Sequence, residues 1–156
     1  MPVSKKWRHG APPVTTILIL EDNPVVRQML GFVLRGKGGY RALEAATEEE
    51  AVAHMERHLE EIEVLVADVC VDDRPGRAIA DRLTRLCPRL RVLFISGYPK
   101  EHLVESRWLE PGDAFLAKPF APERLMRSVK EVLADTWQPH VLSSTAVRTA
   151  CAGGAA

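Results

Sequence analysis

The chain has 156 residues, a length typical of a single domain. Its hydrophobic fraction of 46% and charged fraction of 27% are ordinary values for a globular protein. The 21 basic and 21 acidic side chains give a formal net charge of zero, which excludes the broad positive field that non-specific nucleic-acid binding requires. No apolar run approaches the roughly 18 residues of a membrane span. The three widely spaced cysteines form no C-x-x-C pair, so we expect neither a disulfide framework nor a structural zinc site, and a cytoplasmic location is the default.

The composition divides the chain into three parts. Residues 1–13 are basic, contain Pro and Gly and lack a periodic apolar pattern, so we interpret them as a flexible leader. Residues 135–156 are rich in small residues and nearly uncharged, which indicates a flexible C-terminal tail. Residues 14–134 are expected to form one folded unit.

Short apolar runs alternate with longer amphipathic patterns in this unit. The runs predict strands at residues 14–20, 40–45, 64–67, 92–95 and 114–117. Helical patterns begin near residues 24, 48, 75, 100 and 122, the fourth being short and ending near residue 109. Asn23 and Thr47 are predicted to cap the first two helices. The inner face of the first helix is predicted to carry Val25, Val26, Met29, Leu30, Val33 and Leu34. Strictly alternating strands and helices predict an α/β fold with right-handed crossovers, the flavodoxin-like doubly wound (βα)5 class, with a five-stranded parallel sheet in the order 2-1-3-4-5.

Polar side chains follow four of these strands directly. Glu21 and Asp22 come after the first strand, Asp68 after the third, Ser96 after the fourth and Lys118 after the fifth. Open α/β sheets bind ligands at the carboxyl ends of their strands, and in the predicted order the first and third strands are neighbours. The three carboxylates would then meet.

Three carboxylates in one cleft suit a hard divalent cation, typically Mg²⁺. A lysine and a hydroxyl beside that cation complete a pocket for a phosphoryl group, and the central Asp68 is the candidate nucleophile. Acids at strand ends are commonly structural when taken singly. The agreement of four strand ends on one chemistry favours the functional interpretation.

The stretches that contain these residues resemble a response-regulator receiver domain of two-component signalling, of the chemotaxis-regulator type. They are residues 17–23, 64–68, 94–98 and 117–120. The resemblance covers about residues 14–134. It implies that Glu21, Asp22 and Asp68 hold Mg²⁺ (or Mn²⁺). It also implies that Asp68 is the phosphoacceptor, receiving its phosphoryl group from a sensor histidine kinase or a histidine phosphotransfer protein.

The same resemblance assigns the other contacts of the phosphoryl group. Ser96 and Lys118 would bind its oxygens, and a cis peptide bond is expected at Lys118–Pro119. Further backbone contacts would come from Val69, Cys70 and Gly97.

A switch is implied as well. Ser96 and the aromatic Phe115 would move together on phosphorylation and alter a surface made of the helix after Ser96, the strand 114–117 and the last helix. A downstream protein would bind that surface. The resemblance implies no enzyme activity beyond the domain's own phosphorylation and dephosphorylation. From the zero net charge and the lack of a long apolar run we expect no direct nucleic-acid contact and no membrane contact. The sequence leaves a homodimer open.

The chain departs from the family after the acceptor, where Val71 and Asp72 replace a frequent Met-Pro pair. We expect a looser loop there, with Asp72 and Asp73 making the rim of the site more negative. A degenerate receiver that acts as a phosphorylation-independent docking module is therefore one alternative. A Mg²⁺-dependent phosphohydrolase is another, although Cys70 stands where such enzymes usually carry a second Asp. A flavin-binding protein is disfavoured, because the acids after the first strand would repel a phosphate.

Overall fold

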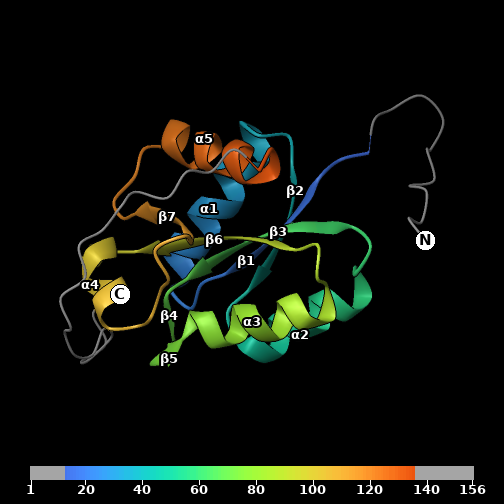
Figure 1. The fold of residues 1–156 in the computed structure, drawn as a ribbon. Coiled ribbons are helices and arrows are strands. Elements are labelled where there is room, and N and C mark those ends of the chain that lie inside the picture. The colour runs from blue at the N-terminus through green and yellow to red at the C-terminus, as the bar shows by residue number, and fades with distance from the viewer. Residues whose placement is uncertain (1–12, 136–156) are drawn as a thin grey trace.

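The computed structural model describes residues 13–135, in which strands and helices alternate along the chain (Figure 1). The elements are β1 (Thr16–Leu20), α1 (Pro24–Gly36), β2 (Arg41–Ala45), α2 (Glu48–Arg57), β3 (Ile62–Asp68), β4 (Cys70–Val71), β5 (Arg74–Pro75), α3 (Gly76–Leu86), β6 (Arg91–Ser96), α4 (Lys100–Glu105), β7 (Ala114–Ala117) and α5 (Pro122–Leu133). Except for Pro13 and Asp135, the predicted leader and tail lie outside the described residues. Between residues 13 and 135, no helix has the length and apolar character that crossing a membrane requires.

The main sheet has five parallel strands in the order β2-β1-β3-β6-β7. This confirms the predicted flavodoxin-like order, because β6 and β7 are the fourth and fifth strands of that sheet along the chain. Helices α1 and α5 cover one face, and α2 and α3 cover the other (Figure 1). With both faces covered, the central strands must be apolar on both sides, and Ile17 to Leu20 are all fully buried.

The two hydrophobic layers follow from the alternation of side chains along each strand. Ile17 and Ile19 pack with Leu30 and Val33 of α1, on the face that α5 also covers. Leu18 and Leu20 point to the opposite face, in the layer that contains Met55 of α2 and Ile79 of α3. The sheet is thereby fixed between two cores, and its carboxyl ends are held in register.

Side-chain caps start the first two helices as predicted. The Asn23 Oδ1 atom accepts hydrogen bonds from the backbone N–H groups of Val25 and Val26 at 2.9 and 3.2 Å, and the Thr47 Oγ1 atom accepts one from Glu50 at 3.2 Å. The cap at Asn23 turns the chain into α1 directly after the two acids that follow β1.

The predicted inner face of α1 is partly wrong. Val25 is 75% exposed and Met29 is 38% exposed, and they form an outer stripe with Phe32. Leu30, Val33 and Leu34 are buried, as predicted. Apolar residues occupy both stripes of this helix, so periodicity alone could not identify the face that packs on the sheet.

Helix α4 is also shorter than predicted. It ends at Glu105 rather than near residue 109. Arg107 has a φ of 62°, in the left-handed region, which ends the helix at this point.

The segment after β3, predicted to be a loose loop, forms the two-stranded antiparallel hairpin β4–β5. Cys70 pairs with Pro75 and Val71 with Arg74, leaving Asp72 and Asp73 as the two-residue turn. Both turn residues have positive φ, 49° and 58°, which is the backbone conformation of a tight hairpin turn. The prediction of a loosened loop is therefore wrong.

Gly76 closes the base of this hairpin. Its N–H donates to the Val69 carbonyl at 2.6 Å. A Cβ atom at residue 76 would lie 1.9 Å from the carbonyl oxygen of Asp68, far inside contact distance. Only glycine allows α3 to begin this close to the end of β3.

We predict that Gly76→Ala lowers the free energy of unfolding by roughly 1–3 kcal/mol, the usual cost of forcing an extra methyl group into a packed site. Urea unfolding measures this change. Gly36→Ala is the control, because a Cβ at the end of α1 would meet nothing within 4 Å. The free energy of unfolding of this variant should rise by up to about 1 kcal/mol. A Gly76→Ala protein as stable as the wild type would contradict the close approach.

Candidate functional site

Three carboxylates gather at the carboxyl edge of the sheet. Leu20 of β1 pairs with Ala67 of β3, so the residues that follow, Glu21 and Asp68, lie side by side. Both are buried, while Asp22 is half-buried. One carboxylate oxygen of each lies within 4.8 Å of the other two. The structure thus brings together the three acids that the sequence singled out.

Lys118 lies between two of these acids. Its Nζ atom is 3.0 Å from Glu21 Oε2 and 3.1 Å from Asp68 Oδ2. The side chain is 14% exposed. Burial lowers the pKa of the amine, but the Asp68 and Glu21 carboxylates outweigh it, so the pKa lies above its ordinary value of 10.5. The lysine therefore stays charged at neutral pH.

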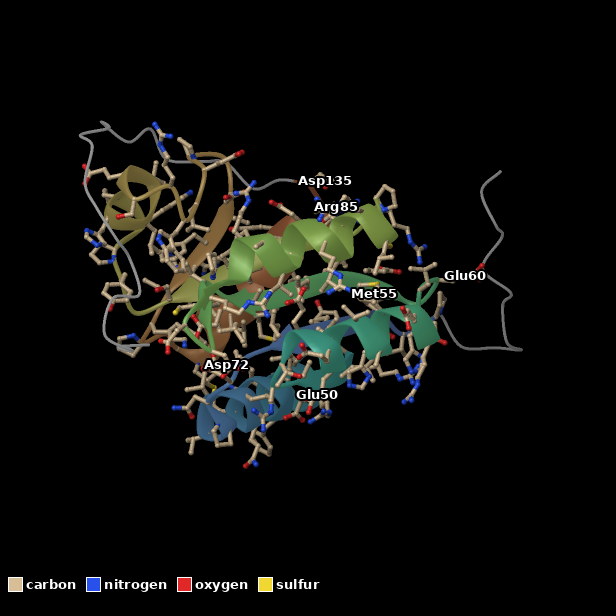
Figure 2. The ribbon with its side chains drawn as sticks, turned by 90° about the horizontal axis from the view of Figure 1, so that it is seen from below. Glu50, Met55, Glu60, Asp72, Arg85 and Asp135 are labelled. Atoms are coloured by element: carbon tan, nitrogen blue, oxygen red, sulfur yellow. The ribbon has the colours of Figure 1, made fainter. Side chains whose placement is uncertain are left out.

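Backbone N–H groups orient each carboxylate. Glu21 Oε1 accepts from Asn23 at 3.1 Å, and Asp68 Oδ1 accepts from Cys70 at 3.2 Å. Asp22 Oδ2 accepts from Asp72, at the tip of the β4–β5 hairpin, also at 3.2 Å. Figure 2 shows Asp72 and Glu60 at opposite ends of the α2–α3 layer, which places the hairpin tip at the carboxyl edge of the sheet. The hairpin is thus part of the wall of the site.

Glu21 carries the largest consequence of this crowding. Burial, and then the nearby Asp68 carboxylate, raise its pKa from 4.5 to about 7, against the opposing effect of Lys118. Three carboxylates and one ammonium leave an excess of negative charge in a buried place. The donors are all carboxylate oxygens, which hard divalent cations such as Mg²⁺ prefer. The residues present therefore fit such a cation.

Ser96 and Phe115, the predicted switch pair, lie on neighbouring strands. Ser96 is 3% exposed, and its Oγ atom accepts from the Tyr98 N–H at 3.1 Å. The Lys118 N–H donates to the Ser96 carbonyl at 2.8 Å, so the residues that end β6 and follow β7 meet at the same edge. Phe115 is half-buried and pairs in register with Phe94, two residues before Ser96.

The predicted backbone contacts divide into two groups. The Cys70 N–H already reaches the Asp68 carboxylate. The Val69 N–H donates instead to the Ile95 carbonyl at 3.0 Å. Gly97 is exposed at the rim. The cis peptide bond expected at Lys118–Pro119 is confirmed.

Arg27 of α1 was missed from the sequence. Its Nη1 atom donates to the backbone carbonyls of Glu21 at 3.0 Å and Asp22 at 3.4 Å, and its Nε atom is 3.8 Å from Glu44 of β2. The sequence shows a cationic residue four positions after the Asn23 cap. It does not show that the Arg27 side chain turns back toward Glu21 and Asp22. Arg27 holds the backbone that carries two of the three carboxylates.

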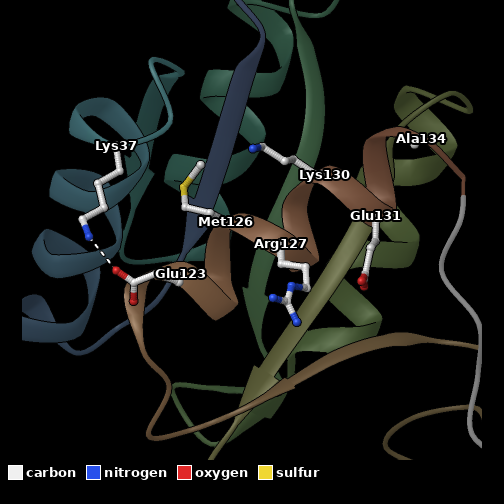
Figure 3. Close-up of a pocket in the computed structure, with 7 residues that line it drawn as sticks. All are labelled: Lys37, Glu123, Met126, Arg127, Lys130, Glu131 and Ala134. Atoms are coloured by element: carbon white, nitrogen blue, oxygen red, sulfur yellow. Dashed lines mark hydrogen bonds and ion pairs between the residues drawn. The ribbon is translucent and has the colours of Figure 1, made fainter.

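A groove of about 550 Å³ lies elsewhere, along α5 (Figure 3). Its lining residues are Lys37, Glu123, Met126, Arg127, Lys130, Glu131 and Ala134. Lys37 and Glu123 form an ion pair at 2.7 Å across one end. The carboxylate cluster is not part of this groove. The charged side chains that line the groove are of both signs and do not indicate a particular ligand.

The chain is similar to known proteins in sequence and in fold. The model of the response regulator receiver domain matches residues 17–130. The sensor kinase CckA of Brucella abortus is 32% identical over 118 residues, which cover 76% of this chain and 12% of that protein. The transcriptional activator protein ExaE of Pseudomonas putida is 31% identical over 119 residues, 76% of this chain and 55% of that protein. The chain thus spans at most about half of these two relatives.

A solved structure gives the same result for the fold. The CheY-like response regulator receiver domain protein of Methanospirillum hungatei superimposes with a TM-score of 0.66 at 26% identity. The match covers 78% of this chain and 95% of that one.

We predict that stability without divalent cations depends on pH through Glu21. The folded protein holds the Glu21 proton up to about pH 7, whereas the unfolded carboxyl releases it near pH 4.5. Folding is therefore linked to proton uptake in this window, and the free energy of unfolding should fall as pH rises from about 4.5 to 7. The expected loss is on the order of 3 kcal/mol, since the pKa of Glu21 rises from 4.5 to about 7 and one pKa unit corresponds to about 1.4 kcal/mol.

Urea unfolding in EDTA at several pH values measures this dependence. Glu21→Gln removes the titrating group and keeps the other shifted carboxyl groups, so its stability should fall less over the same window. Parallel pH profiles for the wild type and Glu21→Gln would contradict the prediction.

Proposed function

Because the chain belongs to the response regulator receiver domain family, we propose that it accepts a phosphoryl group on Asp68 from a sensor histidine kinase or a histidine phosphotransfer protein. The observation that carries the proposal is the pairing of Asp68 with Lys118 at 3.1 Å, beside two further carboxylates. The proposal covers residues 14–134, the part of the chain that we take as the receiver domain. The proposed location of this exchange is the cytoplasm.

Asp68 would act as the nucleophile. One of its carboxylate oxygens attacks phosphorus, the P–N bond of the phosphohistidine breaks, and the electron pair of that bond stays on the imidazole nitrogen. The Cys70 N–H, 3.2 Å from Asp68 Oδ1, keeps the carboxylate oriented for this attack.

Lys118 and Ser96 would bind the transferred group. The Lys118 Nζ atom already contacts Asp68 Oδ2, so it lies within reach of a phosphoryl oxygen attached to that carboxylate. The Ser96 hydroxyl would leave the Tyr98 N–H and donate to a second oxygen. A further backbone contact would come from the N–H group of Gly97. The Val69 N–H would have to leave the Ile95 carbonyl to make another.

Glu21, Asp22 and Asp68 would hold Mg²⁺ or Mn²⁺. When bound, the cation neutralises the developing charge on the phosphoryl oxygens. Arg27 keeps the backbone of Glu21 and Asp22 in place for that role.

The output would be a change in protein contacts at the surface formed by α4, β7 and α5. Movement of Ser96 toward the phosphoryl group would draw Phe115 inward. Lys100 supports the coupling, because its Nζ atom donates to the carbonyls of Pro111 at 3.0 Å and Asp113 at 2.7 Å, which ties α4 to the segment before β7. A downstream protein, or a second copy of the chain, would read this surface, without a direct contact to nucleic acid.

The phosphorylation-independent docking module is the second candidate, and the hairpin tip favours it. Asp72 and Asp73 are exposed at the rim and would repel an anionic donor. The experiment below separates the two functions. A phosphohydrolase would instead release phosphate from an added ester with repeated turnover, which a separate assay of phosphate release measures.

We predict that acetyl phosphate with Mg²⁺ transfers a phosphoryl group to the wild type and leaves Asp68→Asn unmodified, because the amide is not a nucleophile. Intact-mass spectrometry measures the modification. Asp81→Asn, which changes an exposed acid of α3, is the matched control and should be modified like the wild type. Modification of Asp68→Asn at the wild-type rate, or none in the wild type, would contradict the proposal.

A further inference from the structure

Glu48 is a buried acid that the proposed chemistry does not use. It begins α2, and its side chain is 9% exposed. Its two oxygens bind two different guanidinium groups: Oε2 is 2.6 Å from Arg74 Nη2, and Oε1 is 2.9 Å from Arg82 Nη1. The hydrogen bond from Arg82 holds the pKa of Glu48 below its ordinary value. Burial opposes this effect, and the charge of Arg74 adds to it. Glu48 is therefore a fixed anion between β5 and α3.

Arg74 connects this anion to the hairpin. A hairpin with two-residue strands is not stable by itself in water, so β4–β5 needs contacts outside its own pairing. The β4 strand has such contacts, because Cys70 and Val71 are buried in the core. The β5 strand is exposed, and the ion pair of Arg74 with Glu48 fastens it to α2.

The other end of the hairpin reaches the carboxylate cluster. The Asp72 N–H donates to Asp22 Oδ2 at 3.2 Å, as described above. The turn makes this bond while its two residues, Asp72 and Asp73, are held at positive φ. The two contacts together make a continuous path from Glu48 through Arg74 and the turn to Asp22.

We propose that Glu48 and Arg74 are positioning residues for the cation site: their ion pair fixes the β4–β5 hairpin, and the hairpin fixes the Asp22 carboxylate. The inference rests on the proposed function, since it assigns Asp22 to the cation. Groups that hold a metal ligand from behind set its geometry, and their loss typically weakens metal affinity about 10- to 100-fold. Because Glu48 and Arg74 act through the turn, we expect about tenfold, the lower end of that range.

Arg82 offers a matched control. It binds the same carboxylate as Arg74 at a similar distance, and the two arginine side chains are similarly exposed, 54% and 56%. Arg82 lies on α3, outside the hairpin. Losing it removes an ion pair of the same kind and leaves the path from Glu48 to Asp22 intact.

The test is Mn²⁺ binding to the full chain, followed by the electron paramagnetic resonance of the free ion, with thermal unfolding as a second readout. Glu48→Gln and Arg74→Gln should each weaken Mn²⁺ binding about tenfold, and the double variant should lose no more than either one, since both break one path. Arg74→Lys, which keeps the charge, should recover part of the affinity. Arg82→Gln should lower the melting temperature and bind Mn²⁺ like the wild type.

Three results would overturn the inference. Wild-type affinity in Glu48→Gln and Arg74→Gln, with only a lower melting temperature, would show a purely structural ion pair and leave the proposed function standing. Equally weakened Mn²⁺ binding in Arg82→Gln would show a general effect of losing any ion pair of Glu48, rather than an effect of the path through the hairpin. A wild type that binds no Mn²⁺ would instead contradict the cation site, and this inference with it.

Discussion

Lys118 lies between two buried carboxylates, those of Glu21 and Asp68, and its single positive charge cannot balance them together with Asp22. The raised pKa of Glu21 is one result of this imbalance, because a proton is the simplest cation that the site can take up. A divalent cation would balance the excess charge more completely. A phosphoryl group on Asp68 would then replace one of the carboxylate charges that Lys118 now contacts. In the proposed function, the crowding of charge would link metal binding, proton binding and phosphoryl transfer at one place.

The sheet makes this crowding tolerable. Leu20 and Ala67 are paired and fully buried, so the two strands cannot move apart to relieve the repulsion between the acids that follow them. Arg27 and the N–H groups of the surrounding loops supply hydrogen bonds that a relaxed arrangement would lose. Packing of two hydrophobic layers far from the site therefore stabilises an arrangement that is unfavourable by itself.

The sequence predicts the features that depend on local patterns. Alternating apolar runs gave the strand order, and polar residues at strand ends gave the acids and Lys118, because a parallel sheet brings all its carboxyl ends to one edge. Arg27, Glu48 and Arg74 were not found. Their roles depend on side chains that meet across different elements, as those of Glu48 and Arg74 do although the two residues are far apart in the sequence. No periodicity records such a contact.

Other errors have equally specific causes. The hairpin β4–β5 was missed because its turn, Asp72-Asp73, lacks the Asn-Gly or Asp-Gly pair that normally signals positive φ. The α1 face was misplaced at Val25 and Met29 because the helix is apolar on two sides. Both errors concern the surroundings of the site, whereas the acids and the lysine were located correctly from their positions after the strands.

Crystals soaked in Mn²⁺ and measured at the manganese absorption edge test the central claim most directly. Imbalance of charge among Glu21, Asp22, Asp68 and Lys118 predicts an anomalous peak bounded by the three carboxylates. A well-ordered protein with no peak at that position, while Mn²⁺ binds at other acidic side chains, would contradict it.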